Sequence, residues 1–185
     1  MTDIVGWDIG GANVKAACLS YQNGAFQEGA AASRPYEIWR EKDRLPEVLR
    51  SVLAEVSPGQ PQAMAVTMTA ELADVFETKR EGVLFVLHSI IETFPDIPAC
   101  ALSLAEELVP LPQALERPLD FAASNWLATS LYVAGRFPDC ILIDVGSTTT
   151  DIIPIERGRV AALGRCDLER LIAGELVYTG SLRTN

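Results

Sequence analysis

Two short segments with the same pattern constrain the fold of this chain more than any other feature. They read DIGGANVK from Asp8 and DVGSTTTD from Asp144, so the two copies start 144 minus 8, or 136, residues apart. In each copy an aspartate, a β-branched residue, a glycine and a very small residue follow one another without gaps, and apolar stretches lie on both sides. Because this distance can hold one complete domain, the pattern predicts a duplicated domain rather than a short-repeat solenoid.

Around these segments the apolar residues alternate between the periods of strands and helices. Strands are predicted at residues 4–9, 13–20, 25–31, 63–69 and 99–103, and helices at 45–56, at about 121–134 and around the apolar residues of 83–94, with Lys79 and Arg80 at the start of this last helix. The pattern then starts again, with strands at 140–145, 150–155 and 160–163 and a short helix at 168–173. This order predicts an α/β sheet covered by helices. It gives a first domain at 1–136 and a truncated second domain at 137–185.

The overall charge argues against several classes of partner. The chain has 185 residues, 49% of them hydrophobic and 22% charged, and a formal net charge of −10. These values are typical of a globular protein with a sizeable core, whereas the negative charge argues against non-specific binding to nucleic acid or to an anionic membrane. No apolar stretch reaches the roughly 18 residues that span a bilayer, and the N-terminus lacks a secretion signal. A cytoplasmic protein is therefore predicted.

The cysteines and the single histidine do not suggest a metal centre. Cys18, Cys100, Cys140 and Cys166 are scattered, and His88 has no neighbouring ligand in the sequence. Zinc ligands normally occur at short, recognisable spacings, and these four separate cysteines do not form a disulfide scaffold. The thiols are therefore predicted to be reduced.

The two repeated segments carry residue types that bind phosphate. A glycine between two strands is expected to adopt a positive φ and to let a ligand approach the backbone, and successive N–H groups in such a turn form an anion-binding nest. Ser147, Thr148 and Thr149 add hydroxyl donors. Asp8 and Asp144 would repel phosphate directly, but they would hold a hydrated Mg²⁺ that bridges to it. The alternative is a pair of ordinary β-hairpins with Asp and Thr as turn formers.

At these residues the chain resembles the actin-like ATPase superfamily, which includes sugar kinases, Hsp70 and actin. The segments WDIGGANVKAA and LIDVGSTTTDIIPI look like its two phosphate motifs. Within the superfamily the chain is similar to the hydantoinase/oxoprolinase group, and to its branch linked to tetrahydromethanopterin and methanofuran C1-carrier metabolism. The segments that look like this branch are VTMTAELADVFETKREGV, FAASNWLAT and GELVYTGSLRT. The resemblance implies a ribonuclease H-like fold with a mixed five-stranded sheet, helices on both faces, and the start of a second similar domain.

The resemblance also assigns residues to two phosphate loops. The first loop would contain Asp8, Gly10 and Gly11, and Asn13 in the same turn is also expected to bind the cofactor. The second loop would contain Asp144, Gly146, Ser147, Thr148, Thr149 and Asp151. The two aspartates that open the loops are the candidate catalytic and metal-binding residues.

The implied enzyme acts on a phosphate- or diphosphate-activated substrate. In the methanofuran branch the reaction is an ether-forming coupling between a furanmethyl diphosphate and a tyramine derivative. The hydantoinase branch instead implies ATP-driven opening of a cyclic amide, and a kinase is a further alternative. The expected ligands are Mg²⁺ and either ATP or a diphosphate substrate. Because relatives continue through the rest of the second domain, a non-catalytic assembly module, a homo-oligomer and a complementing C-terminal half are also considered.

Three further places in the sequence have two interpretations each. Lys15 either reaches a phosphate from the second strand or is an exposed strand residue. Glu71, between a predicted strand and a predicted helix, is either a catalytic base in the cleft or a solvated loop carboxylate. Asn125 and Trp126 are candidate site residues, although helix capping and core packing also explain them.

Overall fold

The computed structural model describes residues 2–146 and 148–181. By their internal contacts the residues form two compact units, Met1–Ser124 and Asn125–Asn185. Helix α5 (Asn125–Ala134) belongs to the second unit because it packs on the strands of that unit. The division therefore lies before α5, whereas the sequence pattern placed a domain boundary after it.

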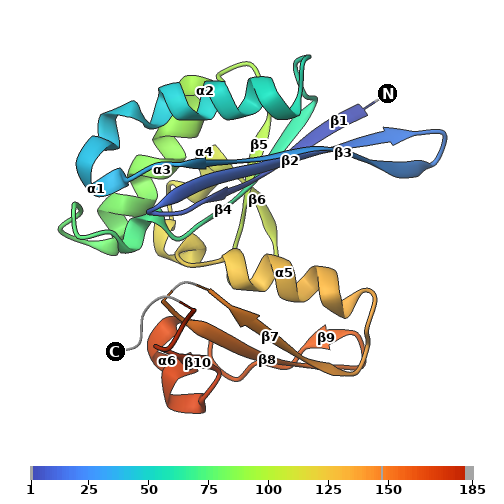
Figure 1. Cartoon of the computed structure of the whole chain (residues 1–185), viewed down its shortest axis with the longest axis vertical. Helices are drawn as coiled ribbons and strands as arrows, with labels where there is room; N and C mark the ends of the chain where they lie inside the picture. The colour runs from blue at the N-terminus through green and yellow to red at the C-terminus, as the bar shows by residue number, and fades with distance from the viewer. Residues whose placement is uncertain (1, 147, 182–185) are drawn as a thin grey trace. The chain divides into compact units, whose positions relative to one another are not determined.

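The first unit is a mixed sheet with helices packed on it (Figure 1). Its strands are β1 (Thr2–Ile9), β2 (Asn13–Gln22), β3 (Ala25–Pro35), β4 (Ala63–Met68), β5 (Ala99–Leu102) and β6 (Leu108–Pro110). Its helices are α1 (Ile38–Glu41), α2 (Leu45–Val56), α3 (Lys79–Thr93) and α4 (Leu111–Ala114), with 3₁₀ segments η1 (Lys42–Arg44), η2 (Ala70–Leu72) and η3 (Pro118–Phe121). The strand order is β3-β2-β1-β4-β5-β6. Strands β1, β4 and β5 are parallel, and the other pairings are antiparallel.

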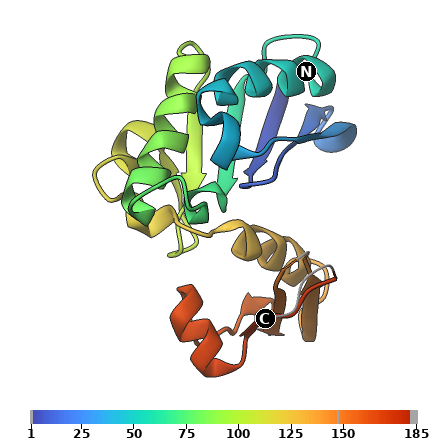
Figure 2. The ribbon, with the colours of Figure 1, turned by 60° about the vertical axis from the view of Figure 1, so that its left-hand side comes forward.

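The core of this unit follows from the alternation of side chains along each strand. Val5, Trp7 and Ile9 of β1 point to one face and are buried. Helix α2 has an apolar stripe that includes the fully buried Leu49 and Val52. Helices α2 and α3 contact each other and lie side by side over the sheet, as both views show (Figures 1 and 2). The sheet and these two helices thus form the two layers that bury the core.

The second unit is smaller and contains a separate sheet. Its strands are β7 (Cys140–Val145), β8 (Thr150–Glu156), β9 (Arg159–Val160) and β10 (Leu176–Val177), and its helices are α5 and α6 (Asp167–Ala173). The order is β10-β8-β7, and β9 also pairs with β8. Helix α5 packs on β8 and β9, where Ile153 and Ile155 are buried.

The repeat seen in the sequence is also present in the pairing of the strands. Asp8 lies opposite Lys15 in the β1–β2 hairpin, and Asp144 lies opposite Asp151 in the β7–β8 hairpin. Both members of the pair are displaced by the same number of residues, since 144 minus 8 and 151 minus 15 each give 136. The two units therefore contain the same hairpin in the same register.

The predicted strands and helices are present, with three differences. The helix expected from residue 121 begins at Asn125, because η3 precedes it and Ala123 has a positive φ of 50°. Strand β9 ends at Val160 instead of continuing to residue 163. Strands β6 and β10 and helices α1 and α4 were not predicted, because elements of two to four residues are too short to show a period. Strand β6 gives the first sheet six strands, where five were expected. None of the helices in the described ranges is long and apolar enough to cross a bilayer.

Candidate functional site

The turn between β1 and β2 is tight and is tied to the chain that follows the hairpin. The amide of Gly10 donates a hydrogen bond to the carbonyl of Asn13 at 2.9 Å. A Cβ atom on Gly10 would lie 3.1 Å from that carbonyl oxygen, so a larger residue would force the turn to shift. The carbonyl of Gly11 accepts a hydrogen bond from the amide of Ile38 at 3.0 Å. These bonds hold the backbone of the turn at the carboxyl end of β1.

The turn between β7 and β8 is closed in the same way. The amide of Gly146 donates to the carbonyl of Thr149 at 2.9 Å, and the Gly146 carbonyl accepts from the amide of Ser181 at 2.9 Å. The hydroxyl of Thr150 donates to the carbonyl of Thr179 at 2.6 Å. The segment after β10 therefore fixes the second turn, just as the start of α1 fixes the first one.

The glycines of the two turns have a different role from the one predicted. Among the described glycines, positive φ values occur at Gly24, Gly158 and Gly174, and not at Gly10 or Gly146. The expectation of a positive φ in the turns was therefore wrong. Glycine is needed at both positions because a carbonyl oxygen lies 3.1 Å and 3.2 Å, respectively, from where a Cβ would be. Atoms of real side chains rarely come so close in a packed structure.

Asp8 and Lys15 form an ion pair across the first hairpin. Lys15 Nζ lies 3.0 Å from Asp8 Oδ2, and the side chains are 57% and 30% exposed, respectively. The other carboxylate oxygen, Asp8 Oδ1, is buried and has no hydrogen-bond partner among the described residues. Leaving such an oxygen unsatisfied is costly. This atom is therefore suited to accept a hydrogen bond from a water of a hydrated cation, or to bind the cation itself.

In the second hairpin the residue opposite the aspartate is a second acid. Asp144 is exposed at the end of β7, and the partly buried Asp151 forms an ion pair with Arg170, with 2.8 Å between Arg170 Nη1 and Asp151 Oδ1. Burial raises the pKa of the Asp151 carboxyl, the nearby Asp144 and Asp167 raise this pKa further, and the Arg170 guanidinium opposes the shift. Arg170 thus neutralises Asp151, while Asp144 is exposed beside this pair.

Arg170 is the residue of this region that the sequence did not single out. It is only 1% exposed, and it also donates from Nη2 to the carbonyl of Glu175 at 3.1 Å and lies over the ring of Trp126, 4.0 Å from the centroid. Ion pairing and a cation–π contact compensate its burial. Helix α6 buries Arg170 while its apolar Leu168 and Ile172 are exposed. This reversal of the usual pattern leaves no signal in the sequence that the arginine is buried.

For the remaining predicted loop residues the structure gives mainly the exposure of their side chains. Thr148 and Thr149 are partly buried, and Asn13 is exposed at the first residue of β2. Ser147 lies outside the described residues. The assignment of these side chains to phosphate binding stays a prediction, as does the convergence of Asp8 and Asp144 on one ligand.

Glu71 is buried and not solvated. It lies in η2 directly after β4, is 2% exposed, and its Oε1 accepts a hydrogen bond from the amide of Ala123 at 2.7 Å. Gly82 of α3 packs against it so closely that a Cβ there would lie 2.6 Å from Glu71 Cα. The amide of Thr69 donates to the carbonyl of Ile9 at 3.0 Å, which places the start of η2 beside the first turn. A catalytic role for Glu71 stays a prediction. Its hydrogen bond with the Ala123 amide joins η2 to the segment that follows η3.

The acidic donors of the turns fit Mg²⁺. Asp8 offers a buried oxygen without a partner, and Asp144 forms no ion pair within the described ranges. Groups of three or more His, Cys, Asp or Glu side chains that could hold a metal do not occur among the described residues. Mg²⁺ keeps several waters and is commonly bound by one or two carboxylates together with phosphate oxygens. A sparse set of carboxylates is therefore compatible with Mg²⁺ when a phosphate is bound as well.

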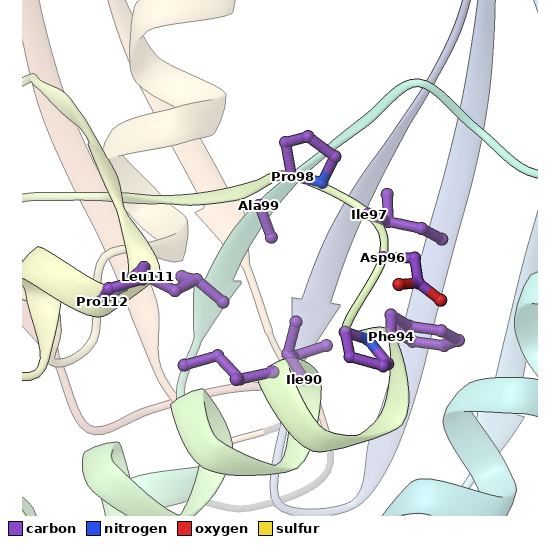
Figure 3. A pocket seen from close by; sticks show the side chains of 10 residues that line it. Ile90, Phe94, Asp96, Ile97, Pro98, Ala99, Leu111 and Pro112 are labelled. Carbon is purple, nitrogen blue, oxygen red and sulfur yellow. The ribbon is translucent and has the colours of Figure 1, made fainter.

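A pocket of about 270 Å³ lies in the first unit at the start of β5, at the end of the parallel strands opposite to the β1–β2 turn (Figure 3). It is lined by Ile90 in the last turn of α3, by Phe94 directly after this helix, by Leu111, and by Pro98 just before β5. Because β1 and β5 point in the same direction, a pocket at the start of β5 is remote from the turn that follows β1. Asp96 is its one charged lining residue, so the pocket does not fit a phosphate.

The chain was compared with known protein families and curated proteins. The family model described as hydantoinase/oxoprolinase matches residues 62–185. A Methanocaldococcus jannaschii protein named "(4-{4-[2-(gamma-L-glutamylamino)ethyl]phenoxymethyl}furan-2-yl)methanamine synthase" is 38% identical over 182 residues, which are 98% of this chain and 52% of that protein. A Methanococcus vannielii protein of the same name is 65% identical over 46 residues, 25% of this chain and 20% of that protein. The chain thus spans about half the length of the first of these relatives.

Solved structures with a similar fold belong to more distant proteins. The Aquifex aeolicus Ppx/GppA phosphatase, type II variant, is 13% identical, with a TM-score of 0.52 over 86% of this chain and 50% of that one. The ethanolamine utilization protein EutJ from Carboxydothermus hydrogenoformans is 18% identical, with a TM-score of 0.52 over 88% of this chain and 50% of that one. Both have the actin-like ATPase fold, which confirms the predicted fold class.

Proposed function

Because the chain belongs to the hydantoinase/oxoprolinase family, we propose that it binds Mg²⁺ and phosphate through its two glycine turns and acts on a diphosphate-activated substrate. The product would be a precursor of a methanofuran-type C1 carrier. The main support for this proposal is the repeated turn. Both units have the same strand register, the same hydrogen bond from the glycine amide across the turn, and an aspartate near the end of the first strand of the hairpin.

The side chains at the turns have the charges that such a ligand needs. Lys15 and the backbone amides of the turns would bind phosphate oxygens, and the carboxylates of Asp8 and Asp144 would hold Mg²⁺. The partnerless Asp8 Oδ1 supports this assignment. When bound, Mg²⁺ would neutralise charge on the diphosphate. The Asp8–Lys15 ion pair places a cation and an anion side by side, so one turn can contact both components of a metal–diphosphate complex.

The chemistry is suggested by the name of the M. jannaschii relative, whose product contains a phenoxymethyl group on a furan ring. In the proposed reaction the phenol oxygen of a tyramine derivative forms a bond to the methylene carbon of a furanmethyl diphosphate. The bond from this carbon to the diphosphate oxygen breaks, diphosphate leaves with the electron pair, and the phenol proton is released. The turns of this chain would hold the leaving group and not the ring.

Binding is tested by thermal unfolding of the chain with diphosphate and Mg²⁺. A ligand at about 100 times its Kd adds about 2.7 kcal/mol to the free energy of unfolding, which raises the Tm. Asp8→Ala and Asp144→Ala are each expected to abolish this rise. Asp96→Ala removes an exposed aspartate beside the start of β5, away from the β1–β2 turn. This control variant is expected to keep the ligand-induced rise in Tm. An unchanged rise in both turn variants would refute the proposed site.

The alternative within the family is ATP-driven opening of a cyclic amide, which the description of the family model favours. The two reactions are separated by their products. The proposed coupling releases diphosphate from a furanmethyl diphosphate and forms an ether in the absence of ATP. Phosphate released from ATP only in the presence of a hydantoin or an oxoproline would instead support the amide reaction and exclude the coupling.

A further inference from the structure

The two turns obtain their positive charge in different ways. In the first hairpin the residue opposite Asp8 is Lys15, and the two side chains form an ion pair. In the second hairpin the residue opposite Asp144 is another acid, Asp151. Like charges that lie directly opposite each other on paired strands are destabilising. The cation that offsets this repulsion comes from outside the hairpin, because Arg170 of α6 contacts Asp151 at 2.8 Å.

The side chain of Arg170 is held from three sides before it meets Asp151. Trp126 of α5 lies against the guanidinium, with 4.0 Å between Arg170 Cζ and the ring centroid. The carbonyl of Glu175 accepts a hydrogen bond from Arg170 Nη2 at 3.1 Å, and the carboxylate of Glu175 accepts one from the amide of Gly164 at 3.0 Å. Gly164 packs so closely that a Cβ there would lie 2.7 Å from Arg170 Cγ. The direction of the guanidinium is therefore set by its surroundings.

Packing alone does not explain an arginine at this position. A buried ion pair is often no more stabilising than well-packed apolar side chains of similar volume. Arg170 Nε is also buried without a hydrogen-bond partner among the described residues, and an unsatisfied buried donor is costly. An apolar side chain would avoid both costs, yet the apolar Leu168 and Ile172 of the same helix are exposed. The arginine therefore has a use other than packing, and the group that it holds is Asp151.

We infer that Arg170 is a positioning residue of the second turn, which fixes the carboxylate of Asp151 beside Asp144 so that the turn binds a Mg²⁺–diphosphate complex. This inference rests on the proposed function. When all three groups are ionised, Asp144, Asp151 and Arg170 together carry one negative charge, so the turn still attracts a divalent cation. Arg170 itself would not contact the ligand. Without the guanidinium, the Asp151 side chain would no longer be held in one orientation.

The inference is tested with a double-mutant cycle on the affinity of the full chain for Mg²⁺–diphosphate, measured by calorimetric titration. Asp151→Asn and Arg170→Met are each expected to weaken binding by at least about fivefold, and the double variant should bind no more weakly than Asp151→Asn, because residues that act through each other are not additive. Arg159→Met is the matched control, because Arg159 is exposed and pairs with the other end of β8. This variant should keep the affinity of the wild-type chain.

The cycle separates positioning from a general effect on the fold. An Arg170 variant that binds as tightly as the wild-type chain would overturn the inference, and so would an equal loss with Asp151 and with Asn at position 151. If Arg170→Met does not fold, Arg170→Lys takes its place in the cycle. A lysine keeps the charge but lacks the planar fork that contacts Asp151 and Glu175 together.

A second measurement needs no ligand. The couplings between Hα and the two Hβ protons of Asp151 report whether its side chain occupies one staggered rotamer. One rotamer is expected in the wild-type chain and in Arg159→Met, and averaged couplings in the Arg170 variant. Averaged couplings in the wild-type chain, or one rotamer retained in the Arg170 variant, would overturn the inference. A wild-type chain that does not bind diphosphate would refute the proposed function, and these couplings would still decide whether Arg170 holds Asp151.

Discussion

Individual glycines set the shape of the two turns, and their effect on stability can be measured. Gly10→Ala and Gly146→Ala would each place a Cβ 3.1–3.2 Å from a backbone carbonyl oxygen, and we expect a loss of about 1–3 kcal/mol in the free energy of unfolding. Gly6→Ala is the control, because nothing lies within 4 Å of a Cβ there. Denaturant titration measures all three. A loss at Gly6 as large as at the turns would contradict the explanation.

The charges beside the second turn predict how Asp151 titrates. Its pKa is raised above the ordinary 3.8 by burial and by Asp144, against the effect of Arg170. Asp144→Asn should therefore lower this pKa, and Arg170→Met should raise it further. Because the folded protein binds this proton more tightly than the unfolded chain, the contribution of Asp151 to stability falls as pH rises from 3.8 through the raised pKa. Carboxyl ¹³C chemical shifts measured against pH check both signs.

Among the helices and strands, the link between η2 and the segment that follows η3 depends on Glu71. Glu71→Ala would leave the Ala123 amide buried without its acceptor, and we expect it to cost about 1–3 kcal/mol. Glu71→Gln keeps an acceptor oxygen and should retain most of this stability. Turnover then separates the two interpretations of the residue. A glutamine variant with normal Tm and no activity would support a catalytic base, and one with full activity would exclude it.

Element positions were predictable where the apolar period is long. Helix α2 and strands β1, β4, β7 and β8 follow directly from the alternation of apolar residues, because burial of one face sets the period. The two turns were predicted because the local pattern is repeated, whereas the ion pair of Asp8 with Lys15 was not predicted. Arg170 and the burial of Glu71 were not, since both depend on contacts with residues distant in the sequence, Asp151 and Ala123. A single sequence carries no periodic signal for such contacts.

For the molecule as a whole, the two compact units should differ in stability. Trp7 is buried in the first unit, and Trp126 is the only tryptophan of the second. We expect the fluorescence of Trp126 to change at a lower denaturant concentration than that of Trp7, because the second unit leaves Ile141, Ile143 and Val145 of β7 exposed. Variants that keep one tryptophan each, with phenylalanine at the other positions, resolve the two signals. Coincident transitions would show that the units unfold as one.

The two ion pairs beside the turns differ in how much solvent reaches them. The Asp8–Lys15 pair is partly exposed, mainly at Lys15, whereas Arg170 is buried against Asp151. Dissolved ions screen exposed charges within about 10 Å at 0.1 M ionic strength and affect buried pairs much less. Added potassium chloride should therefore loosen the first pair and free the Lys15 ammonium, while the second pair persists. The ionic-strength dependence of diphosphate affinity would then include a contribution from the opening of the Asp8–Lys15 pair.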